Sequence, residues 1–382
     1  MGTSAPRVLI LTASYGSGHN RAARALAAAF AAAGAQPRVV DHFRELVHPA
    51  FDRLSRSLYY WILRWAPPLW GGAYWLGDQL AVSSPLLLGM SRLGARKLRR
   101  LLHAESPDFV VSVHPTPAGA LSELRARGLC PIPHATVFTD FVAHTQWIHP
   151  GVDWYCVPSE AIKNDLTARG VPRERVVVTG VPIAPDFLQP VDRASARLAL
   201  GLSSRLPVLL VMAGSLGSLG GLMAAARVIS ELPVSTQALF VTGQDPRLAA
   251  KLKAMFREAE RRIRVFDYTD SVRQLMAAAD LLVSKAGGVT LAEALAAELP
   301  IVCFGSLPGQ ESRNERFVGM TGVALRAQTA ADLRQALSLA LAGPEILQNL
   351  RVKIREVRRP DAARAVVERV LGSARRIAER AS

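Results

Sequence analysis

The first residues with the types and spacing for chemistry lie in a glycine-rich segment at positions 12–20, which reads Thr-Ala-Ser-Tyr-Gly-Ser-Gly-His-Asn. A short aliphatic run precedes it, and a helical pattern follows at once. Glycines in such a turn bring backbone amides close to a ligand at the positive end of the next helix. His19 lies at the tip of this loop, at the start of the helix that follows. We expect His19 to act in the chemistry, and the alternative is a structural histidine.

Two further loops of this kind occur in the second half of the chain. One contains Gly214 and Ser215 after an aliphatic run, and the other reads Lys-Ala-Gly-Gly-Val-Thr over residues 285–290. Paired glycines with a hydroxyl group at a helix N-terminus suit a diphosphate, and they do so without a metal ion. Glu293 follows in the next helix. Its carboxylate can accept hydrogen bonds from both hydroxyls of a ribose, or it is only an acidic residue near the helix start.

A third polar loop in the same half reads Pro-Gly-Gln-Glu-Ser-Arg-Asn over residues 308–314. Gln310, Glu311 and Asn314 place several hydrogen-bond donors and acceptors on one loop and the first turn of a helix. Such a set fits the hydroxyl groups of a sugar. A capped helix start without a ligand is the alternative interpretation.

These loops are positioned by strands that alternate with helices. The alternation predicts an α/β fold of parallel sheets covered by helices on both faces. It restarts after a proline-containing stretch at 180–206, which predicts two doubly wound, Rossmann-like lobes with ligands at the carboxyl ends of the strands, in a cleft between the lobes. The clearest strands are expected at residues 8–11, 109–113, 135–138, 154–157, 176–179, 208–212, 238–242, 281–284 and 301–304.

The composition narrows the class of protein. Half of the 382 residues are hydrophobic, and the three cysteines are too scattered for a disulfide framework or a zinc site. We find no signal peptide, and no run of about 18 apolar residues predicts a spanning helix. The net charge is +15, and the first 100 residues hold 13 basic against 4 acidic side chains. Such a basic excess attracts anionic lipid or nucleic acid.

An aromatic segment at residues 59–75 contains four of the six tryptophans, and a basic run follows at residues 92–100. Tryptophan and tyrosine favour the headgroup layer of a membrane, and arginine attracts anionic lipids. We therefore predict that this part of the chain docks on a membrane or binds a lipid acceptor. The alternatives are a core cluster and a site for single-stranded nucleic acid, although no recognisable nucleic-acid module accompanies it. The residues predicted for the acceptor or membrane side are Gly18, Trp61, Trp65, Trp70, Arg96 and Arg99.

Several motifs together resemble one known family. They are the loop with His19, the stretch Phe138-Thr139-Asp140-Phe141 to His144, Trp147-Ile148-His149, Val181-Pro182-Ile183 before Phe187, the 285–290 loop with Glu293, and Gly309-Gln310-Glu311. The family is that of monogalactosyldiacylglycerol synthases and bacterial processive diacylglycerol glucosyltransferases, which are relatives of the peptidoglycan N-acetylglucosaminyl transferase and have the GT-B fold. The resemblance runs from about Val8 to Val323, with departures at Ser17, Gln146, Ser312 and Arg313.

The resemblance implies an inverting transfer of a hexose from UDP-glucose or UDP-galactose to diacylglycerol. The UDP-sugar would be a substrate, with no cofactor and no metal. His19 is the first choice for the base that deprotonates the acceptor hydroxyl, and Asp140 is the reserve candidate. The residues implied for donor binding are Gly214, Ser215, Tyr268, Thr269, Gly287, Gly288, Thr290, Glu293, Gln310 and Glu311.

The expected domains are an acceptor lobe at residues 1–185, with an aromatic and basic insertion at about 42–103, and a UDP-sugar lobe at 190–360. A basic amphipathic helix at 361–382 is expected to pack back on the first lobe. We expect a cytoplasmic enzyme bound peripherally to anionic lipids on the inner face of the cell membrane, with no nucleic-acid partner. The alternatives are a transferase for another lipid or hydrophobic acceptor, and a catalytically silent regulator that binds nucleotide sugars.

Overall fold

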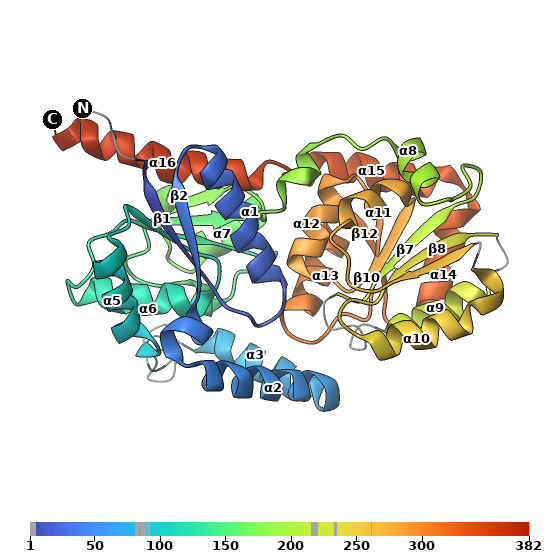
Figure 1. Ribbon diagram of the computed structural model, residues 1–382, viewed down its shortest axis with the longest axis horizontal. Helices are drawn as coiled ribbons and strands as arrows, with labels where there is room; N and C mark the ends of the chain where they lie inside the picture. Colours follow the sequence, from blue (N-terminus) through green and yellow to red (C-terminus); the bar gives the residue numbers. More distant parts are fainter. Residues whose placement is uncertain are drawn as a thin grey trace. The chain divides into compact units, whose positions relative to one another are not determined.

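The structure is a computed structural model that describes residues 5–80, 84, 89, 92–214, 221–232, 235–260 and 262–381, with side chains up to residue 372. The chain forms two compact units, one made of Met1–Pro185 with Asp361–Ser382 and the other of Asp186–Pro360 (Figure 1). Each unit contains a six-stranded parallel sheet with helices packed against it. The α/β fold class predicted from the sequence is confirmed.

The sheet of the first unit has six strands: β1 Arg7–Thr12, β2 Gln36–Asp41, β3 Phe109–Ser112, β4 His134–Val137, β5 Trp154–Val157 and β6 Val176–Val178. Their order across the sheet is β2-β1-β3-β4-β5-β6. The chain runs outward from β1 to β2 and then returns to the other side of β1 for β3, so the strand order reverses between β1 and β3. Loops at such a switch point are where doubly wound sheets bind ligands.

Helices and short turns surround this sheet: α1 Gly18–Ala32, the π-helical turn η1 His42–Val47, α2 Pro49–Trp65, α3 Pro67–Gln79, α5 Ala95–Glu105, α6 Pro115–Ala126, the 3₁₀ turns η2 Thr145–Trp147 and η3 Arg173–Arg175, α7 Glu160–Ala168 and α16 Ala362–Ala381. Alternate residues of β1 build two separate cores. Val8 and Ile10 pack with α1 and α16, whereas Leu9 and Leu11 pack with α5 and α6. Figure 1 shows α16, in red, beside β1 and α1.

The sheet of the second unit also has six strands: β7 Val208–Met212, β8 Gln237–Val241, β9 Ile263–Phe266, β10 Leu281–Ser284, β11 Ile301–Phe304 and β12 Ala324–Ala327. Their order is β12-β11-β10-β7-β8-β9, so this sheet reverses between β7 and β10. Leu209, Val211 and Phe240 form a core with helices of one face. The helices and 3₁₀ turns after residue 184 are η4 Pro185–Leu188, α8 Arg193–Ala199, α9 Leu222–Ser230, α10 Pro246–Met255, η6 Arg257–Ala259, α11 Val272–Ala278, α12 Gly288–Ala296, α13 Gln310–Met320, α14 Ala330–Ala342 and α15 Pro344–Val357.

Three strands, β2, β9 and β12, are not among those predicted from the sequence. Each is the outermost strand of its sheet. Only Val40 is buried in β2, and no residue is fully buried in β9. A strand at an edge has one exposed flank, so it does not need the continuous aliphatic run that identifies the inner strands of a parallel sheet.

Candidate active site

His19 lies where the strand order of the first unit reverses. It is in the first turn of α1, after the loop that leaves β1, and it faces the end of β3. Its Nδ1 atom is 2.8 Å from the backbone carbonyl oxygen of Val113. Because a carbonyl oxygen can only accept a hydrogen bond, Nδ1 carries the hydrogen atom, and Nε2 of the neutral ring keeps its lone pair. The geometry therefore makes Nε2 the basic nitrogen of His19.

The surroundings favour the neutral form of this imidazole. Burial lowers the pKa of His19 below its ordinary value near 6.5, and the carboxylate of Asp140 partly opposes that shift. Thr139 connects the two groups, because its hydroxyl lies 3.0 Å from Nδ1 of His19 and donates to Asp140 at 3.4 Å. The structure thus brings both candidate catalytic residues of the first unit to one site, with Thr139 between them.

A second histidine at this switch point is absent from the sequence-based predictions. His114 follows β3, and its ring contacts that of His19 edge to face with a centroid distance of 4.7 Å. Its Nδ1 accepts a hydrogen bond from the backbone N–H of Thr116 at 3.1 Å and so caps α6. Burial, together with repulsion from His19 and His42, keeps the pKa of His114 well below the ordinary value. The sequence does contain a signal for His114, because a histidine that follows a buried strand so closely lies at the end of the sheet where ligands bind.

The glycine loop is held by side chains of α2. Tyr15 donates its hydroxyl hydrogen to Ser55 Oγ at 2.5 Å, and its ring packs edge-on against Tyr59 at 5.6 Å. The N–H of Gly16 donates to the hydroxyl of Tyr60 at 3.3 Å. The aromatic segment that the sequence assigns to membrane docking therefore packs directly against the loop that carries His19.

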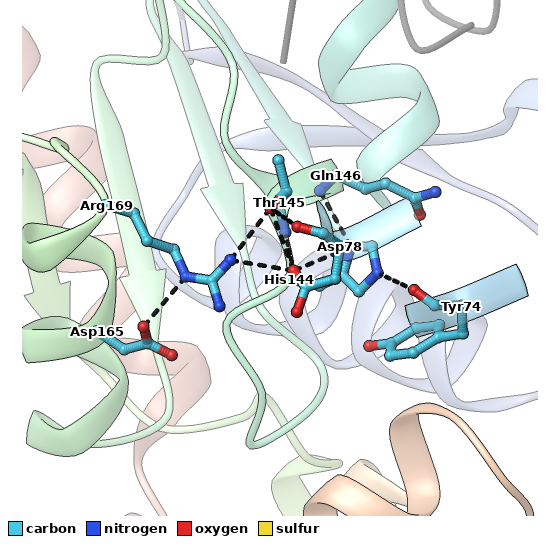
Figure 2. Close-up of polar contacts among 7 residues, drawn as sticks. All are labelled: Tyr74, Asp78, His144, Thr145, Gln146, Asp165 and Arg169. Atoms are coloured by element: carbon cyan, nitrogen blue, oxygen red, sulfur yellow. Dashed lines mark hydrogen bonds and ion pairs between the residues drawn. The ribbon is translucent and has the colours of Figure 1, made fainter. Parts of the chain in front are cut away.

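Helix α3 is held by the segment that follows Asp140 (Figure 2). Asp78 accepts hydrogen bonds from the backbone N–H of Thr145 at 2.9 Å and from the guanidinium of Arg169 at 3.0 Å. Nε2 of His144 lies 2.9 Å from the carbonyl oxygen of Tyr74 and donates to it. Each helix of the α2–α3 pair thus contacts one of the two loops with a candidate catalytic residue. No motif in the sequence singled out Asp78 or Arg169.

The outward side of α2 is apolar. Five large side chains recur on it at steps of three and four residues and form one line along the helix, here termed the apolar stripe: Phe51, Leu54, Leu58, Trp61 and Trp65. Trp61 and Trp65 are 57% and 67% exposed. Trp70 behaves differently, because it is only partly exposed and its ring packs against Tyr59 at 4.8 Å. Two of the three predicted membrane tryptophans therefore lie on the exposed surface, and the third joins α3 to α2.

Arg96 and Arg99 are exposed on α5 and line a hollow of about 520 Å³ beside α6, here termed the arginine hollow. Glu123 is the acidic residue in its wall, and it forms ion pairs with two of the lining arginines. The hollow is therefore strongly basic. Its other arginines are Arg92, Arg100 and Arg127.

In the second unit, the predicted donor loops meet where the strand order reverses. Gly214 follows β7 and Lys285 follows the neighbouring strand β10; a side chain at Gly214, whose φ is +71°, would come within 2.7 Å of Cε of Lys285. Helix α12 begins at Gly288 with no side-chain cap. Its first N–H groups therefore point out of the helix end and suit an anionic group. Gly287 and Thr290 belong to this same turn.

The loop after β11 places the remaining polar candidates. Glu311 is buried, forms an ion pair with Lys285 and accepts a hydrogen bond from the N–H of Leu307 at 2.9 Å. Its carboxylate therefore shapes the loop and orients Lys285. The side-chain oxygen of Gln310 is buried and has no hydrogen-bond partner among the described residues. Glu293 is buried in α12.

The other predicted residues lie at element ends. Tyr268 is exposed after β9, and the hydroxyl of Thr269 accepts from the N–H of Ser271 at 3.1 Å ahead of α11. Gly18 begins α1, and Ser215 lies outside the described residues.

Within the described part of the chain, no three His, Cys, Asp or Glu side chains are grouped so that they could hold a metal ion. Nor does any described helix have the length and apolarity needed to cross a bilayer.

Both halves of the chain match known families. Residues 19–183 match the family model of monogalactosyldiacylglycerol (MGDG) synthase, and residues 208–315 match that of the glycosyltransferase family 28 C-terminal domain. The processive diacylglycerol beta-glucosyltransferase of Bacillus cytotoxicus is 30% identical over 367 residues, which cover 96% of this chain and 93% of the relative. The chain belongs to the family of monogalactosyldiacylglycerol synthases and processive diacylglycerol glucosyltransferases.

This glycosyltransferase also resembles solved structures over its whole length. MurG of Acinetobacter baumannii has a TM-score of 0.63 at 17% identity, with 96% of this chain and 99% of MurG covered. HepE of Anabaena, solved in complex with UDP-glucose, has a TM-score of 0.55 at 14% identity, with 96% and 99% covered. At such identities the likeness shows the fold alone, which is GT-B. The predicted family is confirmed, and the enzyme is a UDP-sugar-dependent hexosyltransferase.

Proposed function

We propose that this glycosyltransferase moves glucose or galactose from its UDP-sugar to diacylglycerol, with inversion, at the inner surface of the cell membrane. The observation that carries the catalytic assignment is the hydrogen bond from Nδ1 of His19 to Val113, because it presents Nε2 as a base. The acceptor is supported by the named activity of the Bacillus relative. The place of action is supported by the exposed apolar stripe on α2.

In the proposed reaction, the acceptor hydroxyl oxygen attacks the anomeric carbon from the side opposite the diphosphate. A bond forms between that oxygen and C1, the bond from C1 to the UDP oxygen breaks, and UDP leaves with the electron pair. Nε2 of His19 takes the hydroxyl proton and later releases it to water. Asp140 favours the imidazolium that forms, because its negative charge raises the pKa of His19. We therefore assign proton removal to His19 and electrostatic support to Asp140.

The donor is proposed to bind at the start of α12 in the second unit. The uncapped N–H groups of this helix and the ammonium of Lys285 are positive groups that would stabilise the leaving diphosphate. The buried oxygen of Gln310 lacks a partner in the described structure, so a sugar hydroxyl could donate to it. Glu293 would accept from the ribose. Glu311 would hold the ammonium of Lys285 in place through their ion pair.

Membrane binding is proposed to use the apolar stripe together with the arginine hollow. A helix with such a stripe lies in the plane of the interface with its apolar side among the acyl chains. Arginines add about 1 kcal/mol each over anionic headgroups, and neither contribution alone anchors a protein firmly. Because α2 holds the glycine loop through Tyr15 and Ser55, an interfacial α2 would bring the acceptor lipid close to His19.

Mass analysis of the lipids that the purified enzyme forms from diacylglycerol vesicles with UDP-glucose or UDP-galactose tests this function. We expect a glycosylated diacylglycerol from at least one donor, formed about 100-fold more slowly or slower still by the variant His19→Gln, which keeps the size of the side chain but lacks the base. Release of UDP with no glycolipid would contradict diacylglycerol as the acceptor. Binding of UDP with no turnover on any lipid would make the protein a regulator.

A further inference from the structure

Asp78 is a buried acidic residue at the end of α3 for which the proposed reaction has no use. It is 8% exposed, and two other elements supply polar groups to it. Oδ1 accepts from the N–H of Thr145 at 2.9 Å and from Arg169 at 3.0 Å, and the Thr145 hydroxyl donates to the Asp78 carbonyl oxygen at 2.7 Å. Figure 2 shows these groups converging on Asp78. Burying a carboxylate costs little free energy only when such partners are in place. Asp78 therefore holds Thr145 and Arg169 in fixed positions relative to α3.

The element that Asp78 holds is the short turn η2, which contains Thr145 and Trp147. His144 links η2 to α3 through two further hydrogen bonds, one to α3 and one to η2. Nε2 of His144, the N-cap, donates to the carbonyl oxygen of Tyr74 at 2.9 Å, and its Nδ1 accepts from the N–H of Gln146 at 3.1 Å. Gly77 allows the close approach, since a Cβ there would lie 3.3 Å from Nε2 of the Gln146 side chain. Helix α3 and η2 therefore pack as one body.

Trp147 connects η2 to the proposed base. Its ring stacks on Phe138 with a centroid distance of 4.6 Å and lies 6.3 Å from the ring of His19. The indole is buried and lies beside the imidazole, which is itself only partly exposed. A shift of η2 would move this ring and expose more of His19 to water.

We propose that Asp78 is a positioning residue for His19, acting through η2 and Trp147. This inference rests on the proposed function, because it takes His19 as the base. The same helix pair also contacts the loop that carries His19, since α2 holds that loop through the hydrogen bond from Tyr15 to Ser55. Helix α2, which bears the apolar stripe, and helix α3 are thus joined to the two loops around the base. The position of the α2–α3 pair, which a bilayer would fix, thereby sets the position of His19.

The variant Asp78→Ala separates this role from a merely structural one. We expect kcat on diacylglycerol in phosphatidylcholine–phosphatidylglycerol vesicles to fall at least about ten-fold, because small displacements of a catalytic group are costly. UDP affinity, a property of the second unit, and flotation on the vesicles, a property of the stripe, should stay at the wild-type level. The acid limb of the pH–rate profile should move to higher pH, since a hydrated imidazole recovers its ordinary pKa. The ionisable groups that face His19, Asp140 and His114, are unchanged in this variant.

The matched control is Asp165→Asn. Arg169 donates to Oδ1 of Asp165 at 3.1 Å, so this variant removes the other carboxylate that binds Arg169 and leaves the contacts with α3 unchanged. It should leave kcat and the pH profile unchanged. If Asp78→Ala does not fold, Thr145→Val is the second variant. It keeps the shape of the side chain and the hydrogen bond from the backbone N–H of residue 145 to Asp78, and it should also lower kcat. An unchanged pH profile with kcat within two-fold of wild type in the folded variant would overturn the inference. Full activity of His19→Gln would instead overturn the assignment of His19 as the base, and release of UDP with no glycolipid by the wild type would overturn the proposed function, whatever Asp78→Ala does.

Discussion

The Nδ1 atom of His19 lies 2.8 Å from the carbonyl oxygen of Val113, a residue 94 positions later in the chain. This hydrogen bond joins the loops at the carboxyl ends of β1 and β3, which are neighbours because the strand order reverses there. It fixes the tautomer of the imidazole and so decides which nitrogen can act as the base.

Replacing His19 by alanine should lower kcat by about 100-fold or more, the usual scale for a general base. UDP affinity should hardly change, because the loops proposed to bind the donor belong to the second unit. Steady-state rates and calorimetry with UDP measure the two quantities. The control is His103→Ala, which removes an exposed histidine from α5. Activity of His19→Ala within a few-fold of wild type would move the base elsewhere.

The pH dependence of kcat/KM should report the pKa of His19 in the free enzyme. Burial lowers the pKa of His19 below 6.5, so the imidazole is neutral at pH 6.5 and above. Activity should therefore decline only when the pH falls below 6.5. Asp140 raises this pKa, because its negative charge favours the imidazolium. In Asp140→Asn the acid limb should therefore move to still lower pH. A loss of about 100-fold together with the disappearance of the acid limb would identify Asp140 as the base instead.

Substitution of Gly214 tests the donor loop. Gly214→Ala places a Cβ 2.7 Å from Cε of Lys285 at a φ of +71°, so the lysine or the loop must move. We expect UDP to bind about ten-fold more weakly, a loss of about 1.4 kcal/mol. Gly170→Ala is the matched control, because its φ is +90° but, apart from its chain neighbours, no described residue has an atom within 4 Å of the added carbon. Similar UDP affinities for both variants would place the diphosphate away from this loop.

Membrane docking should depend on the apolar stripe. The triple variant Leu58→Ala, Trp61→Ala, Trp65→Ala should float poorly on anionic vesicles and lose activity on bilayer lipid, while its UDP affinity is retained. Trp70 is left in place because its ring packs on Tyr59.

The control for the triple variant is Leu198→Ala with Met320→Ala, which removes two exposed apolar side chains of the second unit. Salt should release only part of the wild-type protein, because it screens the arginines but not the apolar contribution. Equal flotation of the triple variant and wild type at all salt concentrations would show that the membrane site lies elsewhere.

The sequence by itself determined the fold class, the family and most inner strands. The expected bounds of β5, β7, β10 and β11 agree with the structure, because a strand buried on both faces requires an aliphatic run of its own length. The glycine loops were equally visible, since a tight turn before a helix limits the residue types that fit. The roles assigned to individual residues of these loops remain predictions.

The tertiary structure alone decided which distant groups meet. Asp78 and Thr145 are 67 residues apart, and nothing in either local sequence indicates the other, because a hydrogen bond across a fold leaves no periodic pattern. The same holds for His114 beside His19, and for the edge strands β2, β9 and β12, which no continuous aliphatic run reveals. Within the aromatic segment, composition could not separate Trp61 and Trp65, which are exposed, from Trp70, which packs on Tyr59. That difference depends on which side of a helix faces its neighbour, and only packing sets it.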